Sequence, residues 1–473
     1  MSRQIQDLVT ICSGAFPEWF KSIELYPQLF SEENRISYFK ATSFGIPRAL
    51  KSLSVDNTLL SESGNSRAGG DIPLPRSKFR INRNNILASA KQIMEVASKN
   101  PKLLIQVEYF GEPGVGLGPT KEFYTLASKE IQRKDADMWL AENFVSETTE
   151  IIPGVRTEQF FVVAPWGLFP KPIELCSDHT KVINNFRFLG RLVGKALLDD
   201  RLLDIPFSEA FYKVLLGRKL TIHELVTVLP YLKHISDMAK LASKKRSILA
   251  NKALSEEERN KALKSLLYKD KPVEAMLLYF TDPSNTVPLI ENGENVEVTL
   301  ENLDEYIIRL SDFYLNKGIQ KQMNAFKEGF EQFVPLERLK IFSPPELDRL
   351  LCGVTQKLEN WTVSEIMDNT KFDQNLNIRV VTDLVNVLVS FTPEQKRKFL
   401  IFLTGSPRLP IGGFKNLKPK FTVQRQPNVD DSYLPSVNTC FLTMKMPEYS
   451  SIELLREKLL QAMYNQHLNF LRT

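Results

Sequence analysis

One cysteine near the end of the chain has a setting in which a nucleophile could act. The segment Leu434–Ser451, LPSVNTCFLTMKMPEYSS, carries Cys440 with a proline on each side and no histidine. An ordinary thiol is about a few per cent thiolate at pH 7. That fraction is enough for attack on a thioester, because one thiolate then replaces another at little net change in free energy. The alternative is that Cys440 is a small apolar residue of the core.

Other cysteine chemistry is less well supported by the sequence. A hydrolase would need a histidine and an orienting acid beside the sulfur, and His467 is the one histidine in the last hundred or so residues. Nothing in the sequence brings His467 to Cys440. We expect no metal site, because paired ligand spacing is missing from the four cysteines, which are Cys12, Cys176, Cys352 and Cys440.

A glycine-rich segment could bind a phosphate group instead. GVGLG, at Gly114–Gly118, lies between a predicted strand and a predicted helix, which is the order found in dinucleotide sites. Its spacing is GxGxG and not GxGxxG, and no GK[ST] follows. We therefore expect a tight structural turn and no cofactor. Nucleotide binding remains an alternative that rests on this loop alone.

Composition describes an ordinary globular chain. The 473 residues are 43% hydrophobic and 25% charged, with a formal net charge of +5. This mild charge does not indicate a nucleic-acid partner. Sparse cysteine fits a reducing compartment, so we expect a cytoplasmic or nuclear protein. We expect no membrane partner, because no run of about 18 apolar residues and no signal-peptide pattern occurs.

The first half of the chain is predicted to be mostly helical. Apolar spacing predicts helices in the first sixty or so residues, after an N-cap at Asn85, after the glycine loop, and over Phe186–Phe207. In the last of these, Gly194 lies one turn after another glycine and favours close packing of a neighbouring backbone. Leu103–Phe110 is predicted to be a strand, and Leu60–Pro75 an exposed loop.

The next segments predict a lysine-rich helical region and a linker. In Ser236–Lys271 the lysines are expected on a solvated helix face, with a capping box of Ser255 and Glu258. Asn292-Gly293 between extended runs predicts a hairpin. The polar segment Asp368–Asn377 is predicted to be a linker between domains.

A compact α/β unit is predicted after that linker. Pro393 and Gln395 follow Thr392 in the pattern of a helix start, and Lys398–Gln426 is predicted to form short strands. A last helix is expected to begin at Ser450, with a second capping box. Cys440 would then lie in the loop that enters this helix.

The Cys440 segment resembles the active-site segment of HECT-type ubiquitin ligases, in which L-P-x-x-x-T-C-F precedes P-x-Y-x-S. Further segments resemble HECT landmarks in the expected order, from about residue 80 to the end: VEYFGEPGVGLGPTKEFYTLASKEI, FRFLGRLVGKALLDDRLLDIPFSEAFYKVLLG, AFKEGFEQFVPLERLKIFSPPELDRLLCG and RKFLIFLTGSPRLPIGGFKNLKPKF. The variants GLGPTKEFY, TGSPRLPIGGF and LPSVNTC are most similar to the ubiquitin-fusion-degradation branch. Members of that branch are much longer, so we expect this chain to be the C-terminal part of a larger protein.

The resemblance implies an α+β fold with two lobes. A helical extension over 1–75 would precede a mostly helical N-lobe over 76–371, which carries a small E2-binding subdomain at about 216–285. A hinge at 372–377 would connect it to an α/β C-lobe at 378–473.

The resemblance also implies a reaction and its partners. Cys440 would accept ubiquitin from a charged E2 enzyme as a thioester, and a lysine of a substrate or of ubiquitin would then attack it. The branch suggests chain extension on substrates that already bear ubiquitin. The rival function is a non-catalytic scaffold that binds E2 or ubiquitin, and the intact NTCF sequence argues against it.

Several residues near the cysteine receive expected roles. Asn438 stands where many family members have histidine, and an amide cannot titrate near neutrality. Thr439 and nearby backbone groups would hold the thioester carbonyl, and Phe441 would anchor the loop. Phe470 occupies the place of a family aromatic used in ligation, and its alternative role is packing on its own lobe.

Two further sets of residues are expected in the N-lobe. Glu112 and Glu122 match acidic positions of the family, and they would either form structural hydrogen bonds or activate the acceptor lysine. The E2 would contact apolar residues of the subdomain, for which core packing is the alternative: Leu232, Ile235, Met238 and Phe280.

Overall fold

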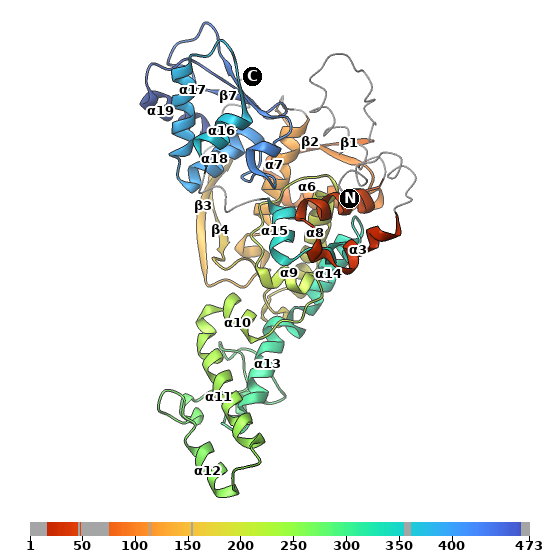
Figure 1. Cartoon of the computed structure of the whole chain (residues 1–473), viewed down its shortest axis with the longest axis vertical. Helices are drawn as coiled ribbons and strands as arrows, with labels where there is room; N and C mark the ends of the chain where they lie inside the picture. Colours follow the sequence, from red (N-terminus) through yellow and green to blue (C-terminus); the bar gives the residue numbers. More distant parts are fainter. Residues whose placement is uncertain are drawn as a thin grey trace. The chain divides into compact units, whose positions relative to one another are not determined.

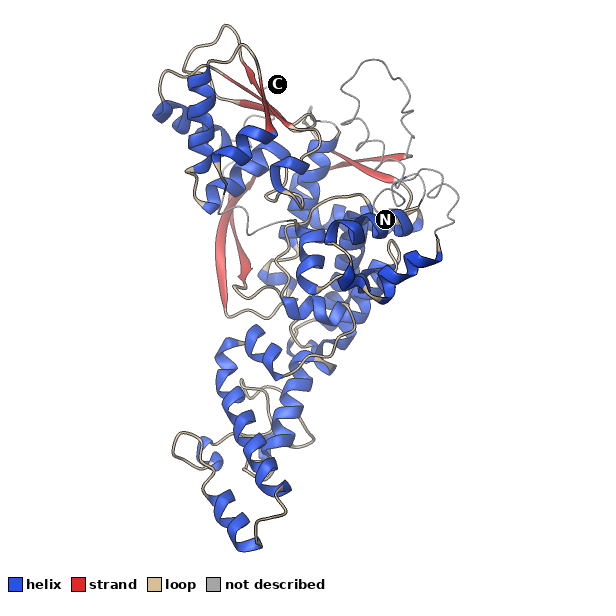
Figure 2. Cartoon of the chain, in the orientation of Figure 1, coloured by secondary structure: helices blue, strands red, loops and turns tan. Residues whose placement is uncertain are grey.

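The computed structural model describes residues 17–45, 48, 75–112, 114, 116–152, 155–353 and 361–464 (Figure 1). These residues form mostly helices, with two two-stranded sheets and one four-stranded sheet (Figure 2), so the α+β class is confirmed. The chain divides into two compact units. The first contains residues 1–131, 188–205 and 328–473, and the second contains 132–187 and 206–327. The loop predicted after Leu60 lies outside the described residues as far as Leu74.

The first part of the first unit contains α3 (Lys21–Leu25), α4 (Glu32–Ser43), β1 (Arg76–Ile81), α6 (Ile86–Lys99), β2 (Leu104–Tyr109) and α7 (Leu117–Glu130). The predicted strand is β2, which pairs in parallel with β1. The backbone N–H of Val107 on β2 donates to Oγ1 of Thr120 on α7 at 2.9 Å, which connects the strand to the helix. Asn85 is the N-cap of α6 as predicted, although its side chain makes no capping hydrogen bond.

Two later helices contribute to this unit, α8 (His179–Leu198) and α15 (Pro344–Cys352). The division between the two units falls within α8 and within α14 (Gln320–Glu331), so each of these two helices belongs partly to the second unit. A Cβ at Gly194 would lie 2.8 Å from the carbonyl oxygen of Phe330, so the predicted close packing at this glycine is confirmed. Arg35 on α4 forms an ion pair with Glu346, whose carboxylate also completes a capping box with Ser343 at the start of α15.

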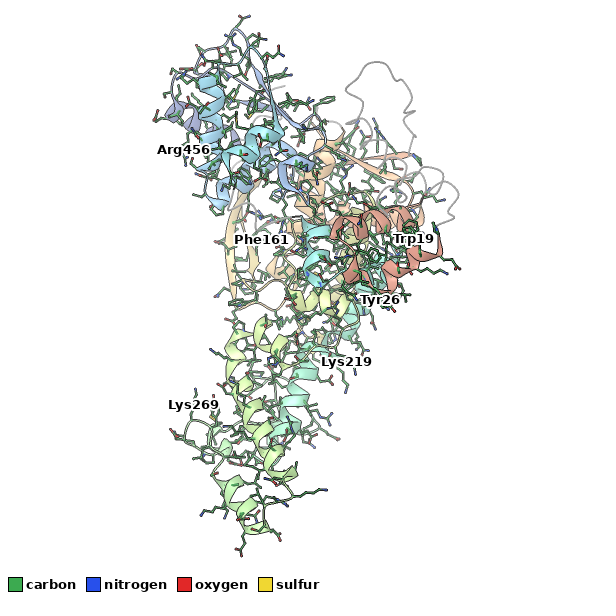
Figure 3. All side chains as sticks on the ribbon, in the orientation of Figure 1. Trp19, Tyr26, Phe161, Lys219, Lys269 and Arg456 are labelled. Atoms are coloured by element: carbon green, nitrogen blue, oxygen red, sulfur yellow. The ribbon has the colours of Figure 1, made fainter. Side chains whose placement is uncertain are left out.

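Residues 361–464 form the C-terminal body of the first unit. It contains α16 (Val363–Asn369), β5 (Thr370–Phe372), α17 (Ile378–Val389), α18 (Pro393–Thr404), β6 (Phe421–Arg425), β7 (Ser436–Asn438), β8 (Thr443–Met446) and α19 (Ile452–Tyr464). The sheet order is β5-β6-β8-β7, with only the β7–β8 pair antiparallel. Its core runs from Trp361 to Met463. Arg456 on α19, labelled in Figure 3, donates to the Ser390 hydroxyl at 2.7 Å and lies over the Phe391 ring.

The hinge predicted at residues 372–377 does not fit this body. Phe372 belongs to β5 and pairs with Val423 on β6, and the N–H of Asp373 donates to the Val423 carbonyl at 2.9 Å. The polar residues that follow form the turn before α17, which Asn377 caps by accepting from the N–H of Arg379. A polar composition therefore marked a turn within the C-terminal body and not a boundary.

Two helix starts in this body can be compared with the sequence predictions, those of α18 and α19. The capping box of Thr392 and Gln395 is confirmed at the start of α18. That helix continues to Thr404, so the strands predicted from Lys398 are wrong for this part, and β6 is the strand of the segment. The residue that caps the start of the last helix is Ser451, one residue after the predicted Ser450. Its hydroxyl accepts from the N–H of Leu454 at 3.2 Å.

The second unit contains β3 (Asn143–Ile152), β4 (Val155–Val163), α9 (Glu209–Leu215), α10 (Ile222–Val228), α11 (Lys233–Ala250), α12 (Glu256–Lys264) and α13 (Leu303–Leu315). The capping box of Ser255 and Glu258 is confirmed at α12. The hairpin predicted at Asn292-Gly293 is wrong. Asn292 has a left-handed φ of 57° and precedes a short 3-10 helix, where a Cβ at Gly293 would meet the backbone of Phe280.

Candidate functional site

Cys440 lies in the tight turn that joins β7 to β8, and not in the loop that enters the last helix. Asn438 and Thr443 are opposite each other at the ends of the two strands. The side chain of Leu442 is 1% exposed and has a left-handed φ of 47°, so it fixes the turn to the core. Cys440 is partly exposed, whereas Phe441 is 67% exposed. Leu442 therefore anchors the loop, which corrects the role expected for Phe441.

Asn438 organises the backbone of this turn. Its side-chain oxygen accepts from the N–H of Cys440 at 3.1 Å and from the N–H of Phe441 at 3.3 Å. An asparagine side chain that accepts from the backbone N–H two residues later forms an Asx-turn, and such turns favour asparagine at the first position. Because both N–H groups donate to Asn438, they do not face a thioester carbonyl here, which corrects the role expected for the nearby backbone.

The glycine loop is the surface on which the cysteine turn packs. Gly116 has a φ of +94° at the N-cap of α7, and a Cβ there would lie 3.4 Å from Sγ of Cys440. A Cβ at the buried Gly118 would overlap Oγ1 of Thr439 and lie 3.1 Å from its Cβ. The glycine loop therefore has a role that its spacing did not reveal, since a side chain at Gly118 would displace Thr439 of the cysteine turn.

A lysine on the same face of α7 completes this surface. Lys121 follows Gly118 by three residues, which puts the two on one side of the helix. A Cβ at Gly405, at the end of α18, would lie 3.4 Å from Cβ of Lys121. Burial and the charge of Arg201 lower the pKa of Lys121 to about 8, and the charge of Cys440 opposes this shift. Sequence reasoning missed Lys121, because the packing of α7 against the cysteine turn is a tertiary contact that the sequence does not reveal.

Two arginines of the C-terminal body hold the segment that follows α8. Nη2 of Arg397 lies 2.7 Å from Oδ2 of Asp204, and Nε of Arg408 lies 3.0 Å from Oδ1 of the same carboxylate. Arg408 is 5% exposed, so this ion pair is largely withdrawn from water. Thr125 on α7 also donates to the carbonyl of Gly405 at 3.0 Å. These contacts fix the face of the body that presents Cys440 to α7.

The two predicted N-lobe carboxylates share one partner. Arg83 pairs with Glu112 and, at 2.8 Å from Nη1 to Oε1, with Glu122, while its guanidinium lies 4.0 Å from the centre of the Tyr109 ring. Both carboxylates are mostly buried. This arrangement favours the structural alternative for Glu112 and Glu122 over activation of an acceptor lysine.

The predicted E2 contacts belong to the core of the second unit. The side chains of Leu232, Ile235, Met238 and Phe280 are 0–1% exposed. They cannot form the docking surface in this structure, which corrects that prediction in favour of its core-packing alternative. Phe470 and His467 lie outside the described residues.

The other described thiols lack the exposure of Cys440. Cys176 is buried and donates to the Pro172 carbonyl at 3.4 Å, and burial raises its pKa to about 12. Cys352 is buried and donates to the Ile205 carbonyl at 3.2 Å. Within the described ranges, no group of three or more His, Cys, Asp and Glu side chains could hold a metal, and no helix is long and apolar enough to cross a membrane.

Comparisons with known proteins identify the family of the chain. The family model for the HECT domain (ubiquitin-transferase) matches residues 125–471. The chain is 36% identical over 497 residues to E3 ubiquitin-protein ligase UPL3 of Arabidopsis thaliana, with 98% of this chain and 26% of the relative covered. It is 37% identical over 477 residues to E3 ubiquitin-protein ligase TRIP12 of Danio rerio, with 98% and 23% covered. It is 34% identical over 476 residues to ubiquitin fusion degradation protein 4 of Saccharomyces cerevisiae, with 98% and 30% covered. The chain thus spans about a quarter to a third of the length of these relatives.

Proposed function

The chain belongs to the HECT-domain family of ubiquitin transferases, and from this we propose that it accepts ubiquitin on Cys440 from a charged E2 enzyme and transfers it to an amine. One observation carries the proposal. Of the described thiols, Cys440 is the partly exposed one, and it lies on a tight turn that Asn438 and Leu442 hold in place. A nucleophile that must meet a large protein thioester needs exposure and a fixed backbone more than it needs a neighbouring base.

The two steps of the proposed reaction have different demands. In loading, the Cys440 thiolate attacks the E2 thioester carbonyl, and the C–S bond to the E2 breaks to release the E2 thiolate. In discharge, a neutral lysine amine attacks the Cys440 thioester, and the electron pair of the C–S bond returns to Sγ. The amine must lose a proton, which passes to water or buffer. No histidine is needed for the first step, which accounts for its absence from the segment.

The decisive experiment separates a covalent intermediate from simple binding. The protein is incubated with charged E2 and ubiquitin and analysed on a non-reducing gel. The wild type should give a ubiquitin adduct that thiol reductant cleaves, Cys440→Ala should give none, and Cys440→Ser should give an adduct that resists reductant. Cys176→Ala, which removes a buried thiol, is the matched control and should load normally. Chain formation by Cys440→Ala would contradict the proposal and favour the scaffold alternative.

We also propose a revised E2-docking surface on the second unit. Leu277 is 70% exposed and Tyr279 is 39% exposed, two residues apart in one segment. Leu277 holds a left-handed φ of 51°, which is uncommon for a leucine and keeps the side chain in water. An apolar pair presented in this way is typical of a contact centre. Serine at both positions should raise the E2 concentration needed for half-maximal loading about tenfold, which corresponds to about 1.4 kcal/mol.

The matched control for this surface is Leu249→Ser. Leu249 is 49% exposed on α11 of the same unit, so its replacement also removes an exposed leucine side chain. Equal effects of the two variants on E2 dependence would contradict docking at Leu277 and Tyr279.

The substrates and the location of the chain are proposals. Because one relative is named for ubiquitin fusion degradation, we infer that acceptors include proteins that already bear ubiquitin. Discharge of the loaded protein onto a linear ubiquitin fusion should then exceed discharge onto the same protein without ubiquitin. The sparse cysteine of the chain supports the separate proposal that it acts in the cytoplasm or the nucleus. Phe470 is proposed to assist only the second step, so its deletion should spare loading and slow discharge.

A further inference from the structure

The contacts around the cysteine turn bring the sulfur within electrostatic reach of a cation, because the charge of Cys440 acts on Lys121. Sγ of Cys440 lies against Gly116 at the start of α7, and Thr439 lies against Gly118. Lys121 is the next residue on that helix face, beneath Gly405 of the C-terminal body. The start of a helix also carries partial positive charge. Any negative charge that forms on Sγ is therefore created at the first turn of α7, within reach of the charge of Lys121.

We propose that Lys121 assists the second step of the reaction electrostatically: its ammonium stabilises the thiolate that leaves from the ubiquitin–Cys440 thioester. The inference rests on the proposed function of Cys440. It adds a residue from α7, which is distant in sequence from the C-terminal body, to the site.

The chemistry predicts an unequal effect on the two steps. Discharge starts from a neutral thioester and ends with a thiolate, so a cation beside Sγ lowers the barrier. In loading, Cys440 is the attacking thiolate. A cation that raises the thiolate fraction of a thiol about tenfold lowers its nucleophilicity about threefold, so the two effects offset each other only in part. Lys121 should therefore matter more for discharge than for loading.

The charged groups that face Lys121 set its own titration. They are Arg201 and Asp200 from the segment after α8, and Cys440 from the β7–β8 turn. Burial and Arg201 hold the pKa of Lys121 near 8, so its ammonium is present below that pH and is lost above it. A thiolate on Cys440 favours the ammonium form of Lys121. The same attraction allows the Lys121 ammonium to stabilise the thiolate.

The test uses a single turnover. The protein is loaded by charged E2, loading is stopped, and discharge onto free lysine is followed on non-reducing gels. Lys121→Gln should load about threefold more slowly and discharge about tenfold more slowly, because the charge acts fully on the leaving thiolate in discharge and its effects partly offset each other in loading. Lys121→Arg should restore discharge. Lys129→Gln, on the same helix, is the control and should behave as the wild type.

A pH series distinguishes a charge effect from a folding effect. Arginine stays charged, so the ratio of wild-type to Lys121→Arg discharge should fall by about threefold to tenfold between pH 7 and pH 9 as Lys121 loses its proton. Gly118→Ala should load normally and discharge slowly, because the added methyl group displaces Thr439 from α7.

Three results would overturn the inference, and none of them is a failure of loading. They are normal discharge by Lys121→Gln, slow discharge by Lys121→Arg, and a ratio that does not change with pH. A wild-type protein that fails to load would instead contradict the proposed function of Cys440. Thermal melting of each variant confirms that the compared proteins are folded.

Discussion

The side-chain oxygen of Asn438 accepts a hydrogen bond from the backbone N–H of Cys440 at 3.1 Å. The same oxygen accepts from the N–H of Phe441, so one amide side chain holds the backbone on which the nucleophile sits. Asn438 thus shapes the turn and cannot act as a base.

Replacement of Asn438 should slow both loading and discharge. Asn438→Ala removes both hydrogen bonds, each worth about 1 kcal/mol net, so we expect loading rates up to about thirtyfold lower. Asn438→Asp keeps an acceptor oxygen but places a carboxylate beside the thiolate. Its deficit should shrink as salt is raised from about 0.05 to 1 M, because the added repulsion is screened. A salt-dependent deficit in the alanine variant would contradict the assignment to turn geometry.

Arg83 should be more important for folding than either of its carboxylate partners. Arg83→Ala leaves Glu112 and Glu122 together in a mostly buried site, and we expect a loss of about 2 to 3 kcal/mol in the free energy of unfolding. Glu122→Gln keeps a hydrogen-bond acceptor and should lose less than half of this. Denaturant unfolding measures both. If Glu122→Gln unfolds normally yet discharges hundreds of times more slowly, then Glu122 activates the acceptor amine and the structural assignment is wrong.

Asp204 should control how the C-terminal body packs in its unit. Asp204→Asn removes the charge opposite Arg397 and Arg408, and Arg408 is buried, so we expect about 2 to 3 kcal/mol of destabilisation and slower discharge. Asp200→Asn is the matched control. The Asp200 side chain is 76% exposed, so its ion pair with Lys40 should contribute less than about 1 kcal/mol. Equal melting temperatures for the two variants would contradict this ranking.

Acid should destabilise the protein in part through Glu346. Burial acts to raise the pKa of this carboxyl, but hydrogen bonds from Arg35 and Ser343 outweigh it and lower the pKa from 4.5 to about 2. The folded state therefore binds the proton less readily than the unfolded state. The resulting stability is present above about pH 4.5 and is lost as pH falls toward 2, up to about 2 to 3 kcal/mol.

Unfolding of Glu346→Gln is the test of that contribution. The variant should be less stable than the wild type at pH 6, and the difference should shrink as pH falls from 4.5 to 2.5. A difference that stays constant over this range would show that Glu346 does not titrate in the predicted window.

Signals within one turn of chain were readable from the sequence. The capping boxes at Ser255 and Thr392 were predicted correctly, because a side chain and a backbone N–H three residues away decide them. The identity of Cys440 as the candidate nucleophile also came from a local pattern. Asn292-Gly293 failed because the turn type depends on Phe280, whose backbone approaches Gly293 from another segment.

Relationships between distant segments could not be read in this way. The polar neighbours of Phe372 predict a linker at this position. In the structure Phe372 lies in β5 and pairs with Val423 on β6, fifty-one residues later. Helical spacing could not distinguish a core face from a docking face at Leu232 or Met238, since both are apolar stripes. The pairing of Arg83 with Glu122, and the contact of Gly116 with Cys440, depend on tertiary packing that no sequence period encodes.

The burial of Cys176 and Cys352 has a practical consequence for chemical biology. Among the described residues, an electrophile that reacts with thiolates should find one accessible sulfur, at Cys440. Within the described part of the chain, ubiquitin that ends in such a warhead should therefore label Cys440 alone, without mutagenesis of the two buried thiols. A version of this reagent that carries a fluorophore would report whether the β7–β8 turn is packed against the glycines of α7 or is accessible to an E2 enzyme.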